Sequence, residues 1–184
     1  MICLDFHFIF VQFLGFLAGV FLVCSYFRKD TNKVLSFHIV SGLLDFFHYF
    51  LLGAFSGSFI YLAEGIRDYL YYKTDKDKYI FIFSGTMYLF ISFFQVRVWY
   101  DYLPIFASLV DGYSLTLSKR YVTVGAIISY GVWVIYNIFV MSYAGLLIDG
   151  FILVSNIWML FSLKEKCKVV RGKKLDLMSN IFSL

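Results

Sequence analysis

The sequence predicts an all-α polytopic membrane protein with seven transmembrane helices, and three observations support this. Hydrophobic residues make up 61% of the 184 residues and charged residues only 15%, which is more apolar surface than a soluble domain of this size can bury. The apolar residues fall into seven segments, most of them close to the roughly 20 residues that cross a bilayer. Lys and Arg gather in every second connection between these segments, as expected of membrane proteins.

The predicted helices are, in chain order, residues 8–27, 34–55, 58–72, 79–96, 103–117, 121–141 and 144–163. The first is mostly apolar, and Gly15 and Gly19 are four residues apart, a spacing that permits close helix packing. The second carries its polar residues on one face. The third is short and holds Glu64, Arg67 and Asp68, although one charge at mid-helix costs about 2.5–3.5 kcal/mol on insertion.

The third segment has two interpretations. It is either a surface amphipathic helix or a spanning helix with Arg67 and Asp68 near its cytoplasmic end, where they snorkel or pair. Without this crossing, Lys73, Lys76 and Lys78 would lie outside the cell and break the charge alternation. We therefore expect it to span.

The last four segments are more conventional. The fourth is rich in aromatic residues, and the fifth has Pro104 in its first turn, where proline is tolerated. The sixth and seventh are long and apolar, and a basic tail, 167–184, follows them.

The distribution of Lys and Arg predicts the topology. Basic residues occur in the connections after the first, third and fifth segments and in the tail: Arg and Lys after the first and fifth and in the tail, and Lys alone after the third. The connections after the second and sixth segments contain neither, and Arg97 stands alone after the fourth. The positive-inside rule then places the N-terminus outside and the C-terminus in the cytoplasm of a multi-pass inner (plasma) membrane protein.

A weak internal repeat predicts the helix arrangement. When the chain is shifted by 88 residues, 34–78 overlays 122–166, with identities that include Gly57 with Gly145 and Lys78 with Lys166. A single transmembrane domain, 1–166, would then consist of repeat one (8–72), a linker helix (79–96) and repeat two (103–163). An odd linker gives both three-helix units the same orientation, which is a 3+1+3 arrangement of parallel repeats.

The composition argues against several functions. The net charge is +4, but the basic residues lie in short loops and the tail, so we expect no nucleic acid partner. Cys3, Cys24 and Cys167 are far apart and form no CxxC or Cys/His pattern, so neither a metal site nor a disulfide framework is supported. No phosphate-binding glycine loop and no catalytic motif occurs. We expect neither an enzyme nor a cofactor.

Ionisable groups inside the membrane are the best functional candidates, because inserting them costs free energy unless they are paired or in contact with water. His38, Ser41, Asp45 and His48 are spaced three, four and three residues apart, which places them on one helix face. They either form the wall of a polar cavity or hydrogen-bond to each other and to neighbouring helices; for His38 we favour the second alternative.

Three further groups extend this set along the chain. Arg67 lies three residues beyond Glu64 and is placed to neutralise it, so the two form either a structural ion pair or part of a substrate or gating site. Asp111 lies at mid-span. Asp149 lies near the outer end of its segment. There we expect access to water to lower the free-energy cost of placing its carboxylate in the membrane.

Asn137 and Asn156 need polar partners in lipid and are therefore expected to face the bundle. They either bind substrate or join helices. Trp133 and Trp158 lie in mid-helix, where aromatic walls suit ring-shaped ligands, although most Phe and Tyr residues are expected to pack or to face the membrane interface.

Several stretches together give the chain a likeness to a known family. They are His48 to Gly53, Ile66 and Arg67, Leu103 and Pro104, Trp133 to Asn137, and Gly145, Ile148, Asp149, Gly150 and Asn156. Over about residues 11–166 the chain resembles the YgjV family of bacterial inner membrane proteins. That family is similar in organisation to the PQ-loop and SWEET group of small transporters, which implies substrate passage between two triple-helix units. Two features depart from the pattern: Pro104 is followed by Ile105 instead of Gln, and Glu64 stands where an uncharged polar residue is expected.

The sequence therefore supports two hypotheses. The first is a SWEET-like, small-molecule transporter that works by alternating access on an unidentified metabolite. The second is a non-transporting membrane receptor or assembly protein, in which the same polar residues are structural. The lipid bilayer is the expected partner in both cases, and a homo-oligomer is compatible with either. For the transporter, the predicted substrate pathway comprises Asp45, His48, Glu64, Arg67, Asp111, Trp133, Asn137, Asp149 and Asn156.

Overall fold

The computed structural model describes residues 6–28, 30–74, 77–117 and 119–181, the side chains of 26, 31, 77, 119, 120 and 163–181 excepted. This part of the chain contains seven α-helices and one short 3-10 helix (η1) and no strand. The elements are α1 (Phe6–Tyr26), α2 (Thr31–Leu51), α3 (Phe55–Lys73), α4 (Asp77–Gln95), η1 (Trp99–Asp101), α5 (Tyr102–Leu115), α6 (Lys119–Phe139) and α7 (Tyr143–Ile181). The predicted all-α class is confirmed.

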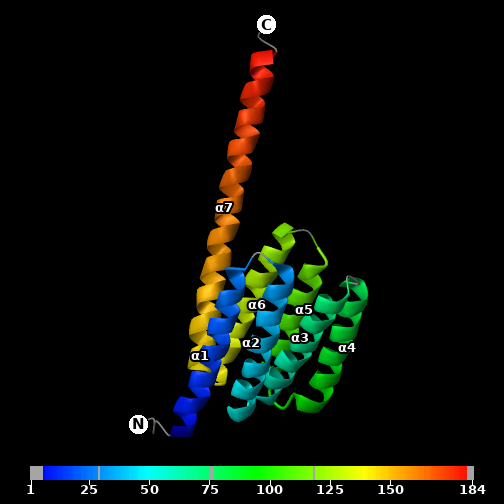
Figure 1. Cartoon of the computed structure of the whole chain (residues 1–184), viewed down its shortest axis with the longest axis vertical. Coiled ribbons are helices and arrows are strands. Elements are labelled where there is room, and N and C mark those ends of the chain that lie inside the picture. Colours follow the sequence, from blue (N-terminus) through cyan, green and yellow to red (C-terminus); the bar gives the residue numbers. More distant parts are fainter. Residues whose placement is uncertain (1–5, 29, 75–76, 118, 182–184) are drawn as a thin grey trace.

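The helices run up and down, and each contacts its successor (Figure 1). Contacts between α3 and α5 and between α1 and α7 close six of the helices into a ring, and α4 packs outside the ring against α3 and α5. The connections α1–α2, α3–α4 and α5–α6 lie at one end of the bundle, which we call the cavity end. The connections α2–α3, α4–α5 and α6–α7 lie at the other, which we call the closed end.

Within the described residues, four helices are long and apolar enough to cross a membrane. They contain the candidate spans Phe6–Ser25, Asn32–Leu51, Tyr121–Phe139 and Tyr143–Ser162. The polar α3, the outer α4 and the 14-residue α5 are not among them. The membrane character predicted from the sequence is thus supported, while the crossing of all seven helices stays a prediction.

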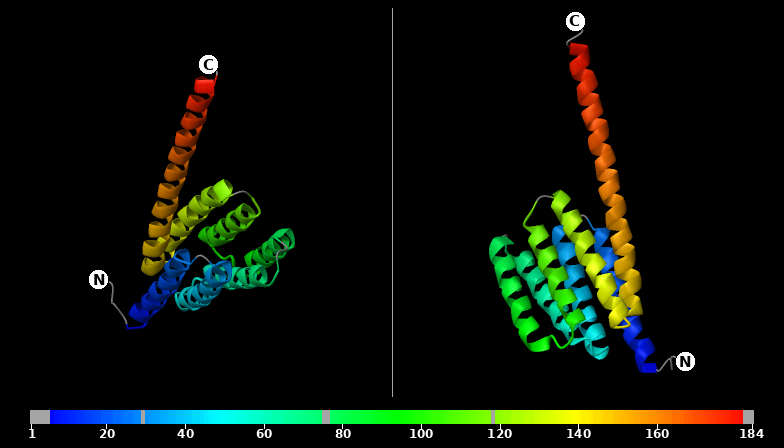
Figure 2. Two further views of the ribbon diagram at one scale, coloured as in Figure 1. Left: turned by 45° about the horizontal axis from the view of Figure 1, so that its top comes forward. Right: turned by 180° about the vertical axis from the view of Figure 1, so that it is seen from behind.

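The last helix is longer than predicted. Segment 144–163 is only the first half of α7, whose backbone continues to Ile181 and projects past the cavity end (Figure 2). Residues 164–171 contain no Gly or Pro and include the good helix formers Lys and Glu, so no residue there ends the helix. The side chains of the predicted basic tail, 167–184, lie outside the described residues.

The bundle is apolar outside and polar inside. Phe93, Leu147 and Trp158 are 83%, 70% and 75% exposed, as suits side chains whose solvent is lipid. Buried positions include many Ser residues along with Arg67 and Asn137, and small residues allow helices to approach closely.

Two glycines on α1 show this close approach. A side chain at Gly15 would collide with the His48 ring on α2, and one at Gly19 with Ile148 on α7. The packing role predicted for this pair is confirmed, and it places α1 between α2 and α7.

Candidate functional site

A cavity of about 550 Å³ lies inside the ring. It reaches the cavity end, where its walls include Val34, Thr74, Leu115 and Val122, all within a turn of a helix terminus. Its inner limit is near the middle of α2, α3 and α6, at Asp45, Tyr61 and Trp133. A volume of this size suits a small organic molecule.

Four aromatic rings separate the cavity from the closed end. Tyr61 and Trp133 have ring centroids 4.5 Å apart, and Tyr49 stacks on Tyr61 at 5.2 Å with an interplanar angle of 18°. Trp133 also meets Tyr136 edge-on at 5.6 Å. Tyr49, Trp133 and Tyr136 are buried, so we call Tyr49, Tyr61, Trp133 and Tyr136 the aromatic floor.

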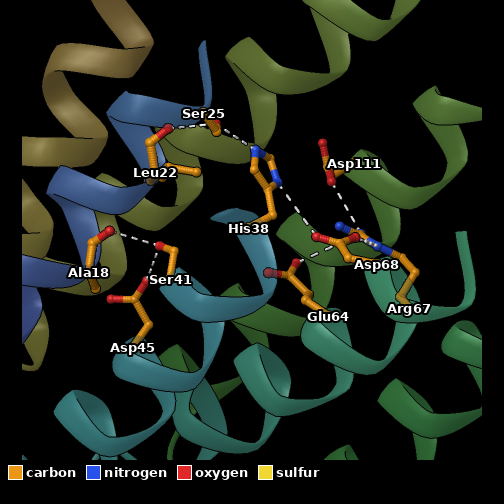
Figure 3. A network of polar contacts seen from close by, with 10 residues as sticks. All are labelled: Ala18, Leu22, Ser25, His38, Ser41, Asp45, Glu64, Arg67, Asp68 and Asp111. Atoms are coloured by element: carbon orange, nitrogen blue, oxygen red, sulfur yellow. Dashed lines mark hydrogen bonds and ion pairs between the residues drawn. The ribbon is translucent and has the colours of Figure 1, made fainter. Parts of the chain in front are cut away.

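One wall of the cavity carries a charged cluster built around Arg67 (Figure 3). Its Nε donates to Asp68 Oδ1 at 3.1 Å, and its Nη1 donates to Asp111 Oδ2 at 3.2 Å. The same Nη1 lies 4.0 Å from Glu64 Oε1, which also accepts a hydrogen bond of 2.6 Å from Ser108. The ion pair expected between Glu64 and Arg67 is therefore one of three around the same guanidinium.

His38 extends this cluster toward α1. Its Nδ1 lies 3.5 Å from Asp68 Oδ2, and its Nε2 lies 3.0 Å from Ser25 Oγ. The Ser25 hydroxyl itself donates to the carbonyl of Leu22. The preference for a structural His38 agrees with these contacts, although the ring also lines the cavity.

Asp45 lies apart from the cluster, where the cavity meets the aromatic floor. Its Oδ2 is 3.4 Å from Ser41 Oγ, whose proton makes a shorter bond of 2.9 Å to the carbonyl of Ala18. Among the side chains that the structure describes, no Lys, Arg or His lies within ion-pair distance of Asp45. Asp45 and His48 do not bond to each other; His48 instead follows the other half of that alternative and bonds to neighbouring parts of the bundle.

His48 belongs to a different site at the closed end. Its Nδ1 is 2.7 Å from the carbonyl of Val11, and its Nε2 is 2.8 Å from Ser142 Oγ. Nearby, Gln12 donates to the carbonyl of Met141 at 3.1 Å and accepts from the backbone N–H of Ala144 at 2.9 Å.

Two more groups of hydrogen bonds connect the helices there. Tyr49 Oη donates to Asn137 Oδ1, and Asn137 Nδ2 donates to Asp149 Oδ2 at 2.8 Å. On the opposite side, Ser56 Oγ donates to Asp101 Oδ1 at 2.8 Å and lies 3.0 Å from Tyr136 Oη. We call these bonds, with those of His48 and Gln12, the closed-end network.

The structure thus divides the residues of the predicted pathway between two places. Asp45, Glu64, Arg67, Asp111, Trp133 and Asn156 line the large cavity. His48, Asn137 and Asp149 lie in the closed-end network. The expected access of Asp149 to water is wrong: the residue is only 4% exposed, and its carboxylate accepts a hydrogen bond from Asn137 inside the bundle. Trp158 is no cavity wall either, since it faces outward.

The sequence did not single out several residues that line the cavity or belong to the closed-end network. Gln12, Ser56, Asp101 and Tyr136 are common residue types with no distinctive spacing. Asp101 offered one signal, because Asp is favoured just before a helix and the predicted helix begins at 103. Its Oδ2 accepts the backbone N–H groups of Arg97 and Val98 at 2.9 and 3.1 Å.

A comparison with protein families gives a match over most of the chain. The model of the family Imp-YgjV, described as bacterial inner membrane protein, matches residues 9–166. No curated protein and no solved structure matches the chain.

Proposed function

Since the chain belongs to the Imp-YgjV family of bacterial inner membrane proteins, we propose that it is a small-molecule transporter that works by alternating access. The observation that carries this proposal is the cavity of about 550 Å³, which reaches the middle of the helices from one end only. The aromatic floor and the closed-end network block the other end. A cavity of this kind, open to one side and closed to the other, is one state of an alternating-access cycle.

The proposal includes the 3+1+3 arrangement, with α1–α3 as the first unit, α4 as the linker and α5–α7 as the second unit. A shift of 88 residues moves the bounds of α2 onto those of α6 and the start of α3 onto that of α7. The same shift relates the α3–α5 contact to the α7–α1 contact. Both agreements support a pseudo-two-fold axis along the membrane normal.

The turns between the second and third helices of each unit give independent support. Gly53 and Met141, 88 residues apart, are the only described residues with positive φ, at 75° and 56°. The following N–H groups make equivalent hydrogen bonds, Ala54 to the carbonyl of Tyr49 and Ser142 to that of Asn137.

The two units meet through different contacts at the two ends of the bundle. In the closed-end network, His48, Gln12 and Tyr49 of the first unit bond to the second unit, at the α6–α7 turn, the start of α7 and the end of α6. Ser56 of the first unit bonds to Asp101 at the start of α5 and to Tyr136 on α6. Toward the cavity end, the units are joined by hydrogen bonds from Arg67 to Asp111 and from Ser108 to Glu64. Rocking of the units would break the closed-end network and close the cavity end.

The proposed topology keeps the N-terminus outside, which directs the cavity to the cytoplasm. The connections at the cavity end hold Arg28, Lys33 and Lys73, among others, and the closed end has Arg97. The positive-inside rule then makes this structure an inward-open state. The proposal includes no catalytic activity.

Accessibility of a cysteine in the cavity tests the proposal without knowledge of the substrate. Ser129 lines the cavity and is 5% exposed. In a variant with Cys3, Cys24 and Cys167 replaced by Ala, Ser129→Cys is treated with a membrane-impermeant thiol reagent in inverted and in right-side-out vesicles. A transporter should be labelled from both faces, because its units alternate between two open states.

Two further single cysteines serve as controls. Phe27→Cys lies exposed at the cavity end and Val98→Cys exposed at the closed end, so the first should react only in inverted vesicles and the second only in right-side-out ones. With these controls in order, labelling of Ser129→Cys from the cytoplasmic face alone would contradict a transporter. It would favour the receptor or assembly protein.

A further inference from the structure

The cavity has an excess of carboxylates, and this leads to an inference about the substrate that rests on the proposed transporter function. Asp45, Glu64, Asp68 and Asp111 line the cavity, whereas its cationic groups among the described residues are Arg67 and, when protonated, His38. We propose that the transported substrate is a small organic cation, an amine with an apolar or aromatic body, and that its charge binds between Asp45 and the aromatic floor.

Arg67 is not available to an anionic substrate. Its guanidinium already donates to Asp68 and Asp111 and faces Glu64 at 4.0 Å. An anion that approached Arg67 would meet three carboxylates around one positive charge and would have to displace one of them. Because unlike charges attract and like charges repel strongly where water is scarce, this wall of the cavity disfavours anions.

Asp45, unlike the carboxylates around Arg67, is a carboxylate that no described Lys, Arg or His side chain pairs with. Among the described residues, its side-chain hydrogen bond is the 3.4 Å contact to Ser41, and no cationic partner lies within ion-pair distance. A carboxylate so far inside a membrane bundle is costly unless a positive charge accompanies it. A protonated amine would supply that charge and also the hydrogen-bond donors.

The aromatic floor gives the same site a second feature suited to cations. Tyr61 and Trp133 line the cavity together with Asp45, and their rings lie 4.5 Å apart. The faces of Trp and Tyr attract cations, more strongly where water is excluded. An apolar or aromatic substrate body would stack on these rings as well. A carboxylate next to aromatic faces therefore selects a cation over a neutral molecule of the same shape.

Trp133 makes the site directly observable. The chain has three Trp residues, and the other two, Trp99 and Trp158, face outward with exposures of 61% and 75%. Substitution of both by Phe leaves Trp133 as the sole indole, at the inner limit of the cavity. Its fluorescence in lipid nanodiscs is then titrated with three probes of one shape: phenethylamine (cation), 2-phenylethanol (neutral) and phenylacetate (anion).

We expect phenethylamine to change the Trp133 fluorescence saturably and to bind about tenfold or more tightly than 2-phenylethanol, with phenylacetate weakest. Asp45→Asn, which keeps the shape and removes the charge, should abolish the preference for the cation. Asp30→Asn is the matched control: it also removes one carboxylate, but at an exposed helix cap outside the cavity, and should keep the preference.

The outcomes separate this inference from the proposed function. Equal affinity for the amine and the alcohol, a preference for phenylacetate, or an unchanged preference in Asp45→Asn would overturn the cationic substrate while leaving a ligand-binding cavity. Absence of any response to phenethylamine would overturn it as well. The labelling of Ser129→Cys from both membrane faces decides separately whether the protein alternates.

Discussion

Arg67 has three carboxylate neighbours and is only 6% exposed, so its removal would leave several negative charges without compensation. We expect Arg67→Met to lower the free energy of unfolding by about 3–5 kcal/mol, the usual effect of removing one partner of a buried ion pair. The measurement is the thermal unfolding midpoint of the purified protein in detergent. Arg28→Met, at an exposed position, is the control and should change stability little.

A second variant separates charge from packing. Arg67→Met combined with Asp111→Asn removes one negative charge along with the positive one and should recover part of the lost stability. If Arg67→Met is as stable as the parent protein, the cluster around Arg67 contributes nothing to folding. Its maintenance would then have to be explained by transport alone.

His48 shows how far single residues could be predicted. The spacing of His38, Ser41, Asp45 and His48 correctly predicts a shared face of α2, because helical pitch fixes the direction of each side chain. Pitch does not tell which neighbour the face meets at each depth. Gly15 lets α1 and α2 approach closely at the level of His48, and the ring fills the space that a side chain at Gly15 would occupy. The cavity, which opens at the cavity end, therefore stops before it reaches His48.

This packing of α1 on α2 leads to a prediction with a matched control. A Cβ atom at Gly15 would lie 2.8–2.9 Å from three atoms of the His48 ring, whereas one at Gly131 on α6 would meet nothing within 4 Å. Gly15→Ala should lower the free energy of unfolding by about 1–3 kcal/mol through overpacking. Gly131→Ala should leave it unchanged or raise it by up to about 1 kcal/mol. Thermal unfolding of the two variants side by side measures the difference, and equal midpoints would contradict the close approach.

The helix-connecting turns at Gly53 and Met141 support a reciprocal experiment. Both residues have left-handed φ, and Met141 is 63% exposed, so its side chain contributes little packing. A non-glycine residue pays about 1–2 kcal/mol for this conformation, partly offset by the chain entropy that glycine loses. We expect Met141→Gly to raise stability slightly and Gly53→Ala to lower it by about 1 kcal/mol. A change of the same sign in both thermal midpoints would argue against equivalent turns.

The helices themselves were more predictable than their ends and neighbours. Hydrophobic runs and the connections between them locate all seven, because the length and polarity of each run can be read without knowledge of its neighbours. They do not show where α7 ends, since its apolar run stops near 163 while the backbone hydrogen bonding continues to Ile181. Nor do they show that α3 lies inside the ring with α4 outside it, because that depends on contacts between helices.

In the bundle as a whole, the balance between the two ends should set the population of the proposed inward-open state. The closed-end network contributes several bonds between the units, and each hydrogen bond is worth about 0.5–1.5 kcal/mol. Tyr136→Phe removes the hydroxyl that bridges Ser56 and the backbone N–H of Gly57, and so removes two contacts of α6 with α3. It leaves the ring of the aromatic floor in place.

We expect this variant to raise the labelling rate of Ser129→Cys from the outer face by about fivefold or more, because about 1.4 kcal/mol changes a two-state equilibrium tenfold. Ser58→Ala is the matched control: its hydroxyl also bonds near the closed end, to the carbonyl of Phe46, but within the first unit. It should destabilise the fold slightly without a change in labelling, since both of its partners move together. Equal labelling rates in the two variants would mean that the closed-end network holds the fold together and does not gate access to the cavity.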